Sequence, residues 1–465
     1  LVFLEGVSGV GFEEVVELRL NNGEVRHGRV IEIDGDKVAI QVFEGTQGIG
    51  LNEAKVEFLG KPLEIALSKE VLGRIFNGAG QAIDGLGPVF ASTKKDVNGE
   101  PLNPVMRVYP RNYIQTGISS IDVLTTLIRG QKLPIFTGTG LPHNELAVQI
   151  VRQAKIADQK NEKFCVVFAA MGVKHDVAHY FQQAFDDAHV MDRVVMFTNL
   201  ANDPIIERLL TPRAALTTAE YLAYELDYNV LVVLTDMTAY CEALREFSSS
   251  MGEIPGRKGY PGYLYSELAS LYERAGMVVG KKGSVTQIPI LTMPNDDITH
   301  PVPDLTGYIT EGQIVLDRDL YQKGIFPPIS VLPSLSRLMK DGIGAKYTRE
   351  DHHALANQLF ASYAKVQDIR SLAAVIGEDE LNELDQVYMI FGNLFEQFFL
   401  NQKDQNRDIL FSLNLAWDLL SVLPIGELGN LDDQLINKYY NREKASKRFG
   451  LKSTTLVNKI ISRGQ

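Results

Sequence analysis

The chain has little cysteine, a single tryptophan and no long apolar run. Its 465 residues include only two cysteines, Cys165 and Cys241, which are too few for a disulfide framework or for a metal site built on cysteine. No stretch approaches the roughly 18 consecutive apolar residues that a membrane-spanning helix needs, and no secretory signal peptide opens the sequence. We therefore expect a cytoplasmic protein in a reducing compartment, which meets a membrane only through partners.

An excess of positive charge is also absent. Lysine and arginine together number 46 against 58 aspartates and glutamates, so the formal net charge is −12. Because affinity for nucleic acids comes largely from cations that neutralise phosphates, this balance argues against a nucleic-acid partner. His143, His175 and His300 are scattered without the spacing of metal ligands, so we expect no metal site.

Three stretches differ in hydrophobic pattern and predict three domains. Residues 1–68 alternate apolar and polar side chains between Asn-Gly and Asp-Gly turn signals, which predicts a small β-barrel or sandwich. Residues 69–345 open with a connection rich in glycine and proline, which we expect to be irregular. They continue with apolar runs between amphipathic helices, typical of an α/β domain with a mostly parallel sheet. Residues 346–465 show helical periodicity and predict an α-helical domain.

A glycine-rich loop at residues 133–145 has the outline of a phosphate-binding loop without its working residues. A short apolar strand leads into a turn at Gly138 and Gly140, and a helical pattern follows. A working loop then carries a lysine for the phosphates and a hydroxyl group for Mg²⁺. This chain has His143 and Asn144 at or next to those positions. The loop is therefore either a lost nucleotide site or an unrelated turn.

An apolar run that ends in Asp236 has the form of the strand whose carboxylate helps to hold Mg²⁺ in nucleotide-hydrolysing enzymes. A buried strand followed by a helix-capping aspartate gives the same pattern, so both interpretations stay open. A further apolar strand, residues 164–172, should be followed closely by a carboxylate if the site hydrolyses ATP. The first acid there is Asp176, which is too far along. Together with the defective loop, this argues against hydrolysis at the chain's own site.

A single arginine, Arg337, lies among apolar and hydroxyl-bearing side chains in residues 332–338. Composition alone favours an exposed or ion-paired arginine over a functional one. The glycine-rich stretch 255–262 carries Arg257 and Lys258, and it either contacts a partner or is a turn-rich connection. The basic stretch after residue 438 indicates a solvated helix or an end without fixed structure, with an acidic partner as the alternative.

Seven segments, in order, resemble the B subunit of the V-type and A-type rotary ATPases. They are Tyr113–Asp122, Arg129–Pro134, Gly140–Glu145, Pro255–Tyr263, Gly283–Pro294, Asp304–Ile314 and Pro333–Leu338. The resemblance covers essentially the whole length. The chain departs from the family pattern at Tyr113, where phenylalanine is expected, and at Thr137 and Thr139, where serine is usual. It also departs at Met251-Gly252, in a segment near the expected shaft contact.

The resemblance implies a multidomain chain with an N-terminal β-barrel, a central RecA-like α/β domain of the P-loop type with a degenerate loop, and a C-terminal α-helical domain. It implies a non-catalytic, regulatory subunit that alternates with catalytic A subunits in an A3B3 ring, with central shaft and peripheral stalk subunits as further partners. ATP or ADP with Mg²⁺ would lie at the A–B interface, and this chain alone would bind no cofactor. The complex would couple ATP hydrolysis or synthesis to proton or sodium transport at the cytoplasmic face of a membrane.

The resemblance also assigns a role to Arg337. It matches the arginine that enters the neighbouring A-subunit site and stabilises charge on the γ-phosphate, an arginine finger. Tyr308 is a second, less specific candidate for the same interface, and His143 and Asn144 match the family's degenerate loop. Two alternatives remain: a self-sufficient RecA-like hexameric ATPase of the secretion type, and a scaffold that contributes no catalytic group.

Overall fold

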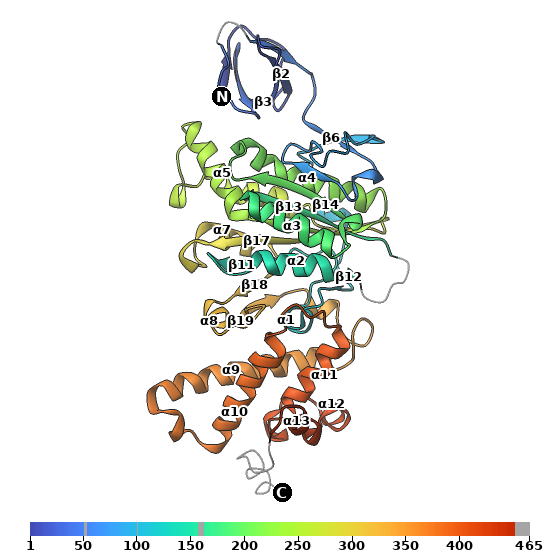
Figure 1. Cartoon of the computed structure of the whole chain (residues 1–465), viewed down its shortest axis with the longest axis vertical. Helices are drawn as coiled ribbons and strands as arrows, with labels where there is room; N and C mark the ends of the chain where they lie inside the picture. Colours follow the sequence, from blue (N-terminus) through green and yellow to red (C-terminus); the bar gives the residue numbers. More distant parts are fainter. Residues whose placement is uncertain (51–53, 100, 157–161, 452–465) are drawn as a thin grey trace. The chain divides into compact units, whose positions relative to one another are not determined.

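The computed structural model describes residues 1–50, 54–99, 101–156 and 162–451 (Figure 1). The contacts among these residues divide the chain into two compact units. Unit 1 draws on 1–108, 163–291 and 304–309, and unit 2 on 109–162, 292–303 and 310–465. Each unit is therefore assembled from segments that are separated in sequence. Among the described residues, no helix is both long enough and apolar enough to cross a membrane.

Unit 1 begins with a five-stranded antiparallel sheet. Its spatial order is β1 (Val2–Leu4), β4 (Lys37–Val42), β3 (Val25–Asp34), β2 (Val15–Arg19) and β5 (Lys55–Phe58). Val16 and Leu18, two apart on β2, are fully buried in the core of this sheet. Gly23 and Gly35 occupy the predicted turns with φ of +85° and +61°, a backbone region that favours glycine. The predicted alternation and turns are confirmed.

A parallel sheet follows in unit 1. Its order is β17 (Ser284–Met293), β15 (Asn229–Thr235), β13 (Phe164–Val173), β14 (Val194–Leu200) and β7 (Ile75–Asn77). Every residue of β15 is buried, as expected for a strand covered on both faces. The apolar runs predicted for an α/β domain correspond to the strands β13, β14, β15 and β17. Strand β7 differs from the prediction, because it lies within the stretch expected to be an irregular connection and pairs in parallel with β14.

Four helices accompany the strands of unit 1 along the chain. They are α3 (His175–Asp187), α4 (Ile205–Tyr224), α5 (Met237–Ser250) and α6 (Leu264–Tyr272). The short strands β6 (Glu64–Leu67) and β8 (Thr93–Asp96) form a separate antiparallel pair. Strand β16 (Gly276–Val278) pairs with both β17 and β9 (Arg107–Val108). Helix α7 (Pro301–Ile309) contains residues of both units.

Unit 2 contains the strands that carry the candidate site. Strand β11 (Ile135–Gly138) pairs in parallel with β18 (Gly312–Leu316), and β18 pairs antiparallel with β19 (Ile329–Ser336). Helix α1 (Ser119–Leu124) precedes β11, α2 (His143–Gln153) follows it, and α8 (Arg318–Gln322) follows β18. A short pair, β10 (Ile114–Gln115) and β12 (Lys155–Ile156), flanks this region in sequence.

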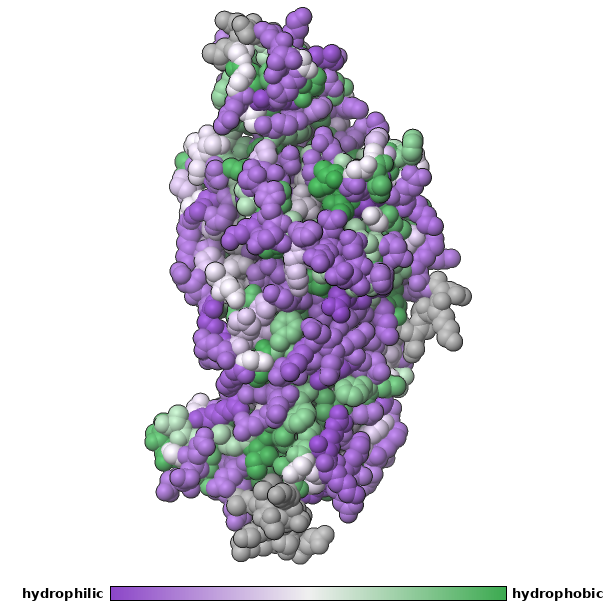
Figure 2. Space-filling model, viewed as in Figure 1, coloured by the Kyte–Doolittle hydropathy of each residue, from purple (hydrophilic) through white to green (hydrophobic). Residues whose placement is uncertain are grey.

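The C-terminal part of unit 2 is helical, as predicted. It comprises α9 (His352–Ile376), α10 (Glu383–Leu394) continued by a π-helical turn at Phe395–Leu400, α11 (Ile409–Leu420), α12 (Asp433–Tyr439) and α13 (Arg442–Arg448). Leu413, Trp417 and Leu420 are buried together in its core. Figure 2 shows a mostly hydrophilic surface, with hydrophobic side chains gathered over the C-terminal helices.

The basic stretch after residue 438 is better ordered than a freely solvated end. Helix α13 holds Lys444 and Arg448 against Asp418 of α11, at 2.9 and 2.5 Å. Asp418 is almost fully buried, so these cations neutralise a carboxylate of the chain itself. Lys452, the last basic residue of the predicted stretch, lies outside the described residues.

Candidate nucleotide-interface site

The loop after β11 uses its own backbone donors. Gly140 has φ of +80°, which favours glycine. The Leu141 N–H donates to the Gly138 carbonyl at 3.1 Å, and the His143 N–H donates to the Leu141 carbonyl at 2.8 Å. Pro142 has no N–H to offer. Two backbone donors of the kind that cradle phosphate in a working loop are therefore engaged within this loop, and a third is missing.

His143 and Asn144 begin α2, and both are half-buried. The Nδ1 atom of His143 lies 3.0 Å from the Leu141 carbonyl oxygen, so the ring turns back onto the loop. Neither side chain supplies the ammonium group or the hydroxyl group of a working phosphate-binding loop. The structure therefore gathers Gly138, Gly140, His143 and Asn144 in one loop, with the predicted deficits.

An ion pair lies against this loop. Arg318 donates to the two carboxylate oxygens of Asp296 at 2.8 and 2.9 Å, and to the Thr139 carbonyl at 3.0 Å. A Cβ atom at Gly138 would lie only 2.0 Å from Asp296 Oδ1, so glycine permits this approach. The hydrogen bond from Arg318 also lowers the pKa of Asp296. A carboxylate held at this point opposes the binding of a phosphate group to the loop.

Sequence reasoning missed the roles of Asp296 and Arg318. Arg318 stands 179 positions after Thr139, and no local motif marks either partner of the pair. The only available signal was Gly138 itself, which was interpreted as a turn glycine.

Asp236 belongs to unit 1, directly after β15. Its Oδ1 atom accepts a hydrogen bond from the Thr238 N–H at 2.8 Å and caps α5. The capping arrangement, left open by the sequence, is thus present in the structure. Asp176 lies in the first turn of α3, where its carboxylate accepts a hydrogen bond from the Val177 N–H at 3.0 Å.

Arg337 directly follows β19 and is exposed. Its N–H donates to the Glu311 carbonyl at 2.9 Å, and its Nη1 atom lies 3.4 Å from the Thr310 carbonyl. Within the described ranges of the chain, no carboxylate forms an ion pair with Arg337. Of the two alternatives that composition favoured, an exposed or an ion-paired arginine, the structure shows the exposed one. Among the residues that the structure describes, its positive charge therefore faces solvent without a counter-ion.

Strand register separates Arg337 from the degenerate loop. Ile135 at the start of β11 is in register with Ile314, and Gly312 at the start of β18 is in register with Ser336. Arg337 therefore lies beside the beginning of β11, whereas the loop follows the end of that strand. At about 3.3 Å per residue, the six steps along the chain from Lys132 to Gly138 span about 20 Å. The structure does not bring the arginine to the chain's own loop.

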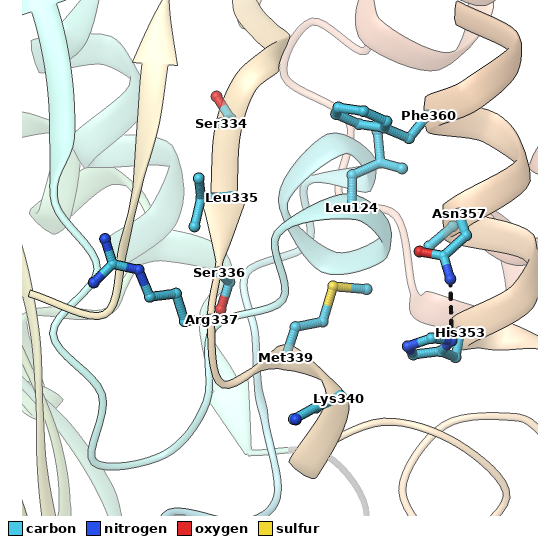
Figure 3. Close-up of a pocket in the computed structure, with 11 residues that line it drawn as sticks. Leu124, Ser334, Leu335, Ser336, Arg337, Met339, Lys340, His353, Asn357 and Phe360 are labelled. Atoms are coloured by element: carbon cyan, nitrogen blue, oxygen red, sulfur yellow. Dashed lines mark hydrogen bonds between the residues drawn. The ribbon is translucent and has the colours of Figure 1, made fainter. Parts of the chain in front are cut away.

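A cavity of about 290 Å³ lies beside Arg337 (Figure 3). The guanidinium group points away from α9, which contributes His353, Asn357 and Phe360 on the opposite side of the view. Lys340, which is also exposed, lines the same cavity. The other lining residues are Leu124, Ser334, Leu335, Ser336, Met339 and Ala356.

Tyr308 is on α7 in unit 1, and 73% of it is exposed. Its ring is accessible to another molecule. In the part of the chain that the structure describes, no group of three or more His, Cys, Asp or Glu side chains is arranged to hold a metal ion.

The barrel, the α/β strands with their phosphate-loop outline and the helical C-terminal part together define the ATP synthase alpha/beta class. The beta-barrel domain of the ATP synthase alpha/beta family matches residues 1–60, and the nucleotide-binding domain of that family matches residues 117–336. The C-terminal domain of V and A type ATP synthase matches residues 341–440. These matches confirm the predicted fold class.

Relatives that match almost the whole chain show which branch of this family the chain resembles. The V-type ATP synthase beta chain 2 of Clostridium tetani is 64% identical over 446 residues, which are 96% of this chain and 97% of that protein. The B subunit of the A-type ATP synthase of Aeropyrum pernix is 57% identical over 446 residues, 96% of each protein. The solved ATP synthase subunit NeqB from Nanoarcheaum equitans is 40% identical with a TM-score of 0.71, covering 88% of this chain and 98% of that one. The chain belongs to the family of beta chains, or B subunits, of the V-type and A-type ATP synthases.

Proposed function

We propose that this chain is a non-catalytic, regulatory subunit that completes the catalytic site of a neighbouring A subunit with Arg337. The observation that carries the proposal is an exposed guanidinium beside the start of β11, away from the chain's own loop, with no carboxylate partner among the described residues. A charge in that position serves a partner better than it serves the chain itself. The defects around Gly138 and His143 support the same proposal, in which the chain's own loop is not catalytic and Arg337 acts in the site of a neighbour.

The chemistry of the proposed site is electrostatic. Negative charge spreads over the γ-phosphate oxygens as the terminal phosphate is transferred, and a guanidinium group placed there stabilises it. Arginine fingers contribute about 10³–10⁵ in rate, which corresponds to roughly 4–7 kcal/mol of barrier. An exposed ion pair contributes at most about 1 kcal/mol, so the two roles of an arginine differ measurably.

Membership in the family supports the remaining assignments of the proposal. The chain alternates with A subunits in an A3B3 ring and contacts the central shaft and peripheral stalk subunits. ATP or ADP with Mg²⁺ lies at the A–B interface, with Tyr308 as a further contact. The complex couples ATP hydrolysis or synthesis to proton or sodium transport from the cytoplasmic face of the membrane.

The decisive experiment replaces Arg337 with alanine and, separately, with lysine in the assembled complex. We expect Arg337→Ala to lower kcat by about 10³-fold or more without loss of assembly. Arg337→Lys should recover only part of this loss, because an ammonium group lacks the planar fork of guanidinium. The matched control is Arg19→Ala, which removes an exposed arginine that pairs with Glu17 and Glu57.

Two results would overturn the proposal. Near-normal turnover of the assembled Arg337→Ala complex would leave the chain as a scaffold without a catalytic group. Robust Mg²⁺-dependent ATP hydrolysis by the isolated chain, together with a homohexameric native mass, would instead indicate a self-sufficient ATPase.

A further inference from the structure

We propose that Gln131 and Lys132 are positioning residues that hold Arg337 in place through Glu311 and Ser336. This inference rests on the proposed function of Arg337. It assigns to Gln131 and Lys132, which precede β11 in the chain, the role of supporting the arginine finger.

Gln131 is fully buried and joins the two strand ends next to Arg337. Its Nε2 atom donates to the Glu311 carbonyl at 3.1 Å and to Ser336 Oγ at 2.9 Å. Its Oε1 atom accepts a hydrogen bond from the Ile128 N–H at 2.9 Å, which fixes the orientation of the amide. Because a buried amide is costly to leave unsatisfied, these bonds hold Ser336 and Glu311 at a fixed separation.

Lys132 holds the other side of Glu311. The Lys132 N–H donates to Glu311 Oε2 at 2.8 Å, and its Nζ atom lies 2.9 Å from Glu311 Oε1. The Glu311 N–H donates in return to the Lys132 carbonyl at 3.1 Å. The Lys132 side chain is 4% exposed and the Glu311 side chain is 28% exposed, so the lysine end of this charge-assisted pair is shielded from solvent.

Glu311 transmits this restraint to Arg337. Its carbonyl accepts hydrogen bonds both from Gln131 Nε2 and from the Arg337 N–H. Ser336 Oγ, which accepts from Gln131, donates to the Thr126 carbonyl at 3.0 Å. Both residues that flank Arg337 in space are therefore tied to the segment before β11.

The close approach of β18 and β19 restrains the backbone that carries the arginine finger. Gly312 has φ of +138°, and a Cβ atom there would lie 2.2 Å from the Leu335 carbonyl oxygen. Only glycine allows the strands to meet this closely. The backbone next to Arg337 is thus restrained both by this contact and, through Glu311, by the hydrogen bond from Gln131.

A finger acts only if its guanidinium reaches the transferring phosphate, and a misplacement of about 1 Å can cost about 10²-fold in rate. Removal of the Gln131 amide should therefore lower kcat for ATP without a matching change in KM. A residue that merely stabilises the fold would lower the amount of assembled complex and leave kcat per complex unchanged.

The test measures kcat and KM of the assembled complex with Gln131→Leu, which removes the side-chain hydrogen bonds at similar volume. We expect kcat to fall about 10- to 100-fold, with KM for ATP within about twofold. Ser336→Ala removes one of these hydrogen bonds, that between Gln131 and Ser336, and should lower kcat several-fold. This second variant keeps the test decisive if the complex with Gln131→Leu does not assemble. The matched control is Gln149→Leu, a buried glutamine that donates to the Lys403 carbonyl at 2.9 Å.

A second readout separates positioning from a general loss of stability. In an Arg337→Lys background, Gln131→Leu should reduce kcat much less than it does beside the native arginine, since residues that act as a unit give non-additive losses. Unchanged kcat in assembled Gln131→Leu and Ser336→Ala complexes, or fully multiplicative losses, would overturn the inference. If Arg337→Ala itself kept normal turnover, the proposed function would fail first, so the two failures are distinguishable.

Discussion

The indole nitrogen of Trp417 donates a hydrogen bond to Oδ2 of Asp351 at 2.5 Å. Asp351 is fully buried and also accepts two hydrogen bonds from Arg349, at 2.5 and 2.7 Å. The Arg349 guanidinium lies 4.5 Å from the centre of the Tyr439 ring, and that ring stacks on Trp417 with centroids 5.3 Å apart. The chain's single tryptophan therefore joins the start of α9 to α11 and α12.

Replacement of Asp351 with alanine should destabilise the helical part of unit 2 strongly. The change leaves the Arg349 charge and the Trp417 N–H without their buried acceptor, and breaking a buried pair in this way costs about 3–5 kcal/mol. Urea unfolding followed by Trp417 fluorescence measures the loss directly. The control is Asp379→Ala, at an exposed position, which should change the free energy of unfolding by less than about 0.5 kcal/mol. Equal stabilities of the two variants would show that the Asp351 network contributes little.

His352 makes the same region sensitive to acid. Burial lowers the pKa of His352 to about 4. In its neutral form Nε2 donates to the Val123 carbonyl at 3.0 Å, and Nδ1 accepts from Thr348 Oγ1 at 2.9 Å. Between pH 6.5 and 4 the unfolded chain therefore binds more protons at this residue than the folded chain. Stability rises with pH across this window and is lost as the pH falls through it, by about 3 kcal/mol in total.

The measurement for His352 is the free energy of unfolding, followed by Trp417 fluorescence, at two pH values. These are about pH 7 and about pH 4.5, and the interval between them covers most of this window. His352→Gln should be less stable at neutral pH and should lose the part of the slope that this residue causes. The neighbouring exposed His353→Gln is the control and should keep the wild-type slope. If His352→Gln and the wild type lost stability in parallel on acidification, another group would be responsible.

The sequence predicted those elements whose signal is local. Val16 and Leu18 alternate with polar residues, and the continuous apolar run of β15 marks a strand covered on both faces. Strand β7 escaped prediction because its three residues gain their structure from pairing with β14. The deficits at His143 and Asn144 could likewise be predicted from the motif alone.

The rest of the site depends on contacts between distant segments. Arg318 meets Asp296 and the Thr139 carbonyl across 22 and 179 positions, and neither spacing leaves a pattern in the sequence. Gln131 was part of a segment that resembled the family but carried no role, since its partner Ser336 lies 205 positions away. That no described carboxylate pairs with Arg337 could not be predicted, because composition left an exposed and an ion-paired arginine as equal alternatives.

The final prediction concerns the degenerate loop. The double variant His143→Lys with Asn144→Thr places an ammonium group and a hydroxyl group in the missing positions. We nevertheless expect no ATP hydrolysis by the isolated chain above the wild-type background. The N–H groups of Leu141 and His143 remain bonded within the loop, and Asp296 still lies against Gly138. No carboxylate directly follows β13 in the sequence to activate water, since the first acid after it is Asp176.

Phosphate release from Mg²⁺-ATP, measured beside the wild-type chain, checks this prediction. Adding Asp296→Asn removes the negative charge and should increase the affinity for ATP, measured by calorimetry, without starting turnover, because binding does not supply the missing base. Sustained turnover by the double variant would contradict this prediction. It would show that the loop lacked only the lysine and the hydroxyl group of a working phosphate-binding loop. Binding without turnover would instead locate the remaining deficit beyond the loop, at the end of β13.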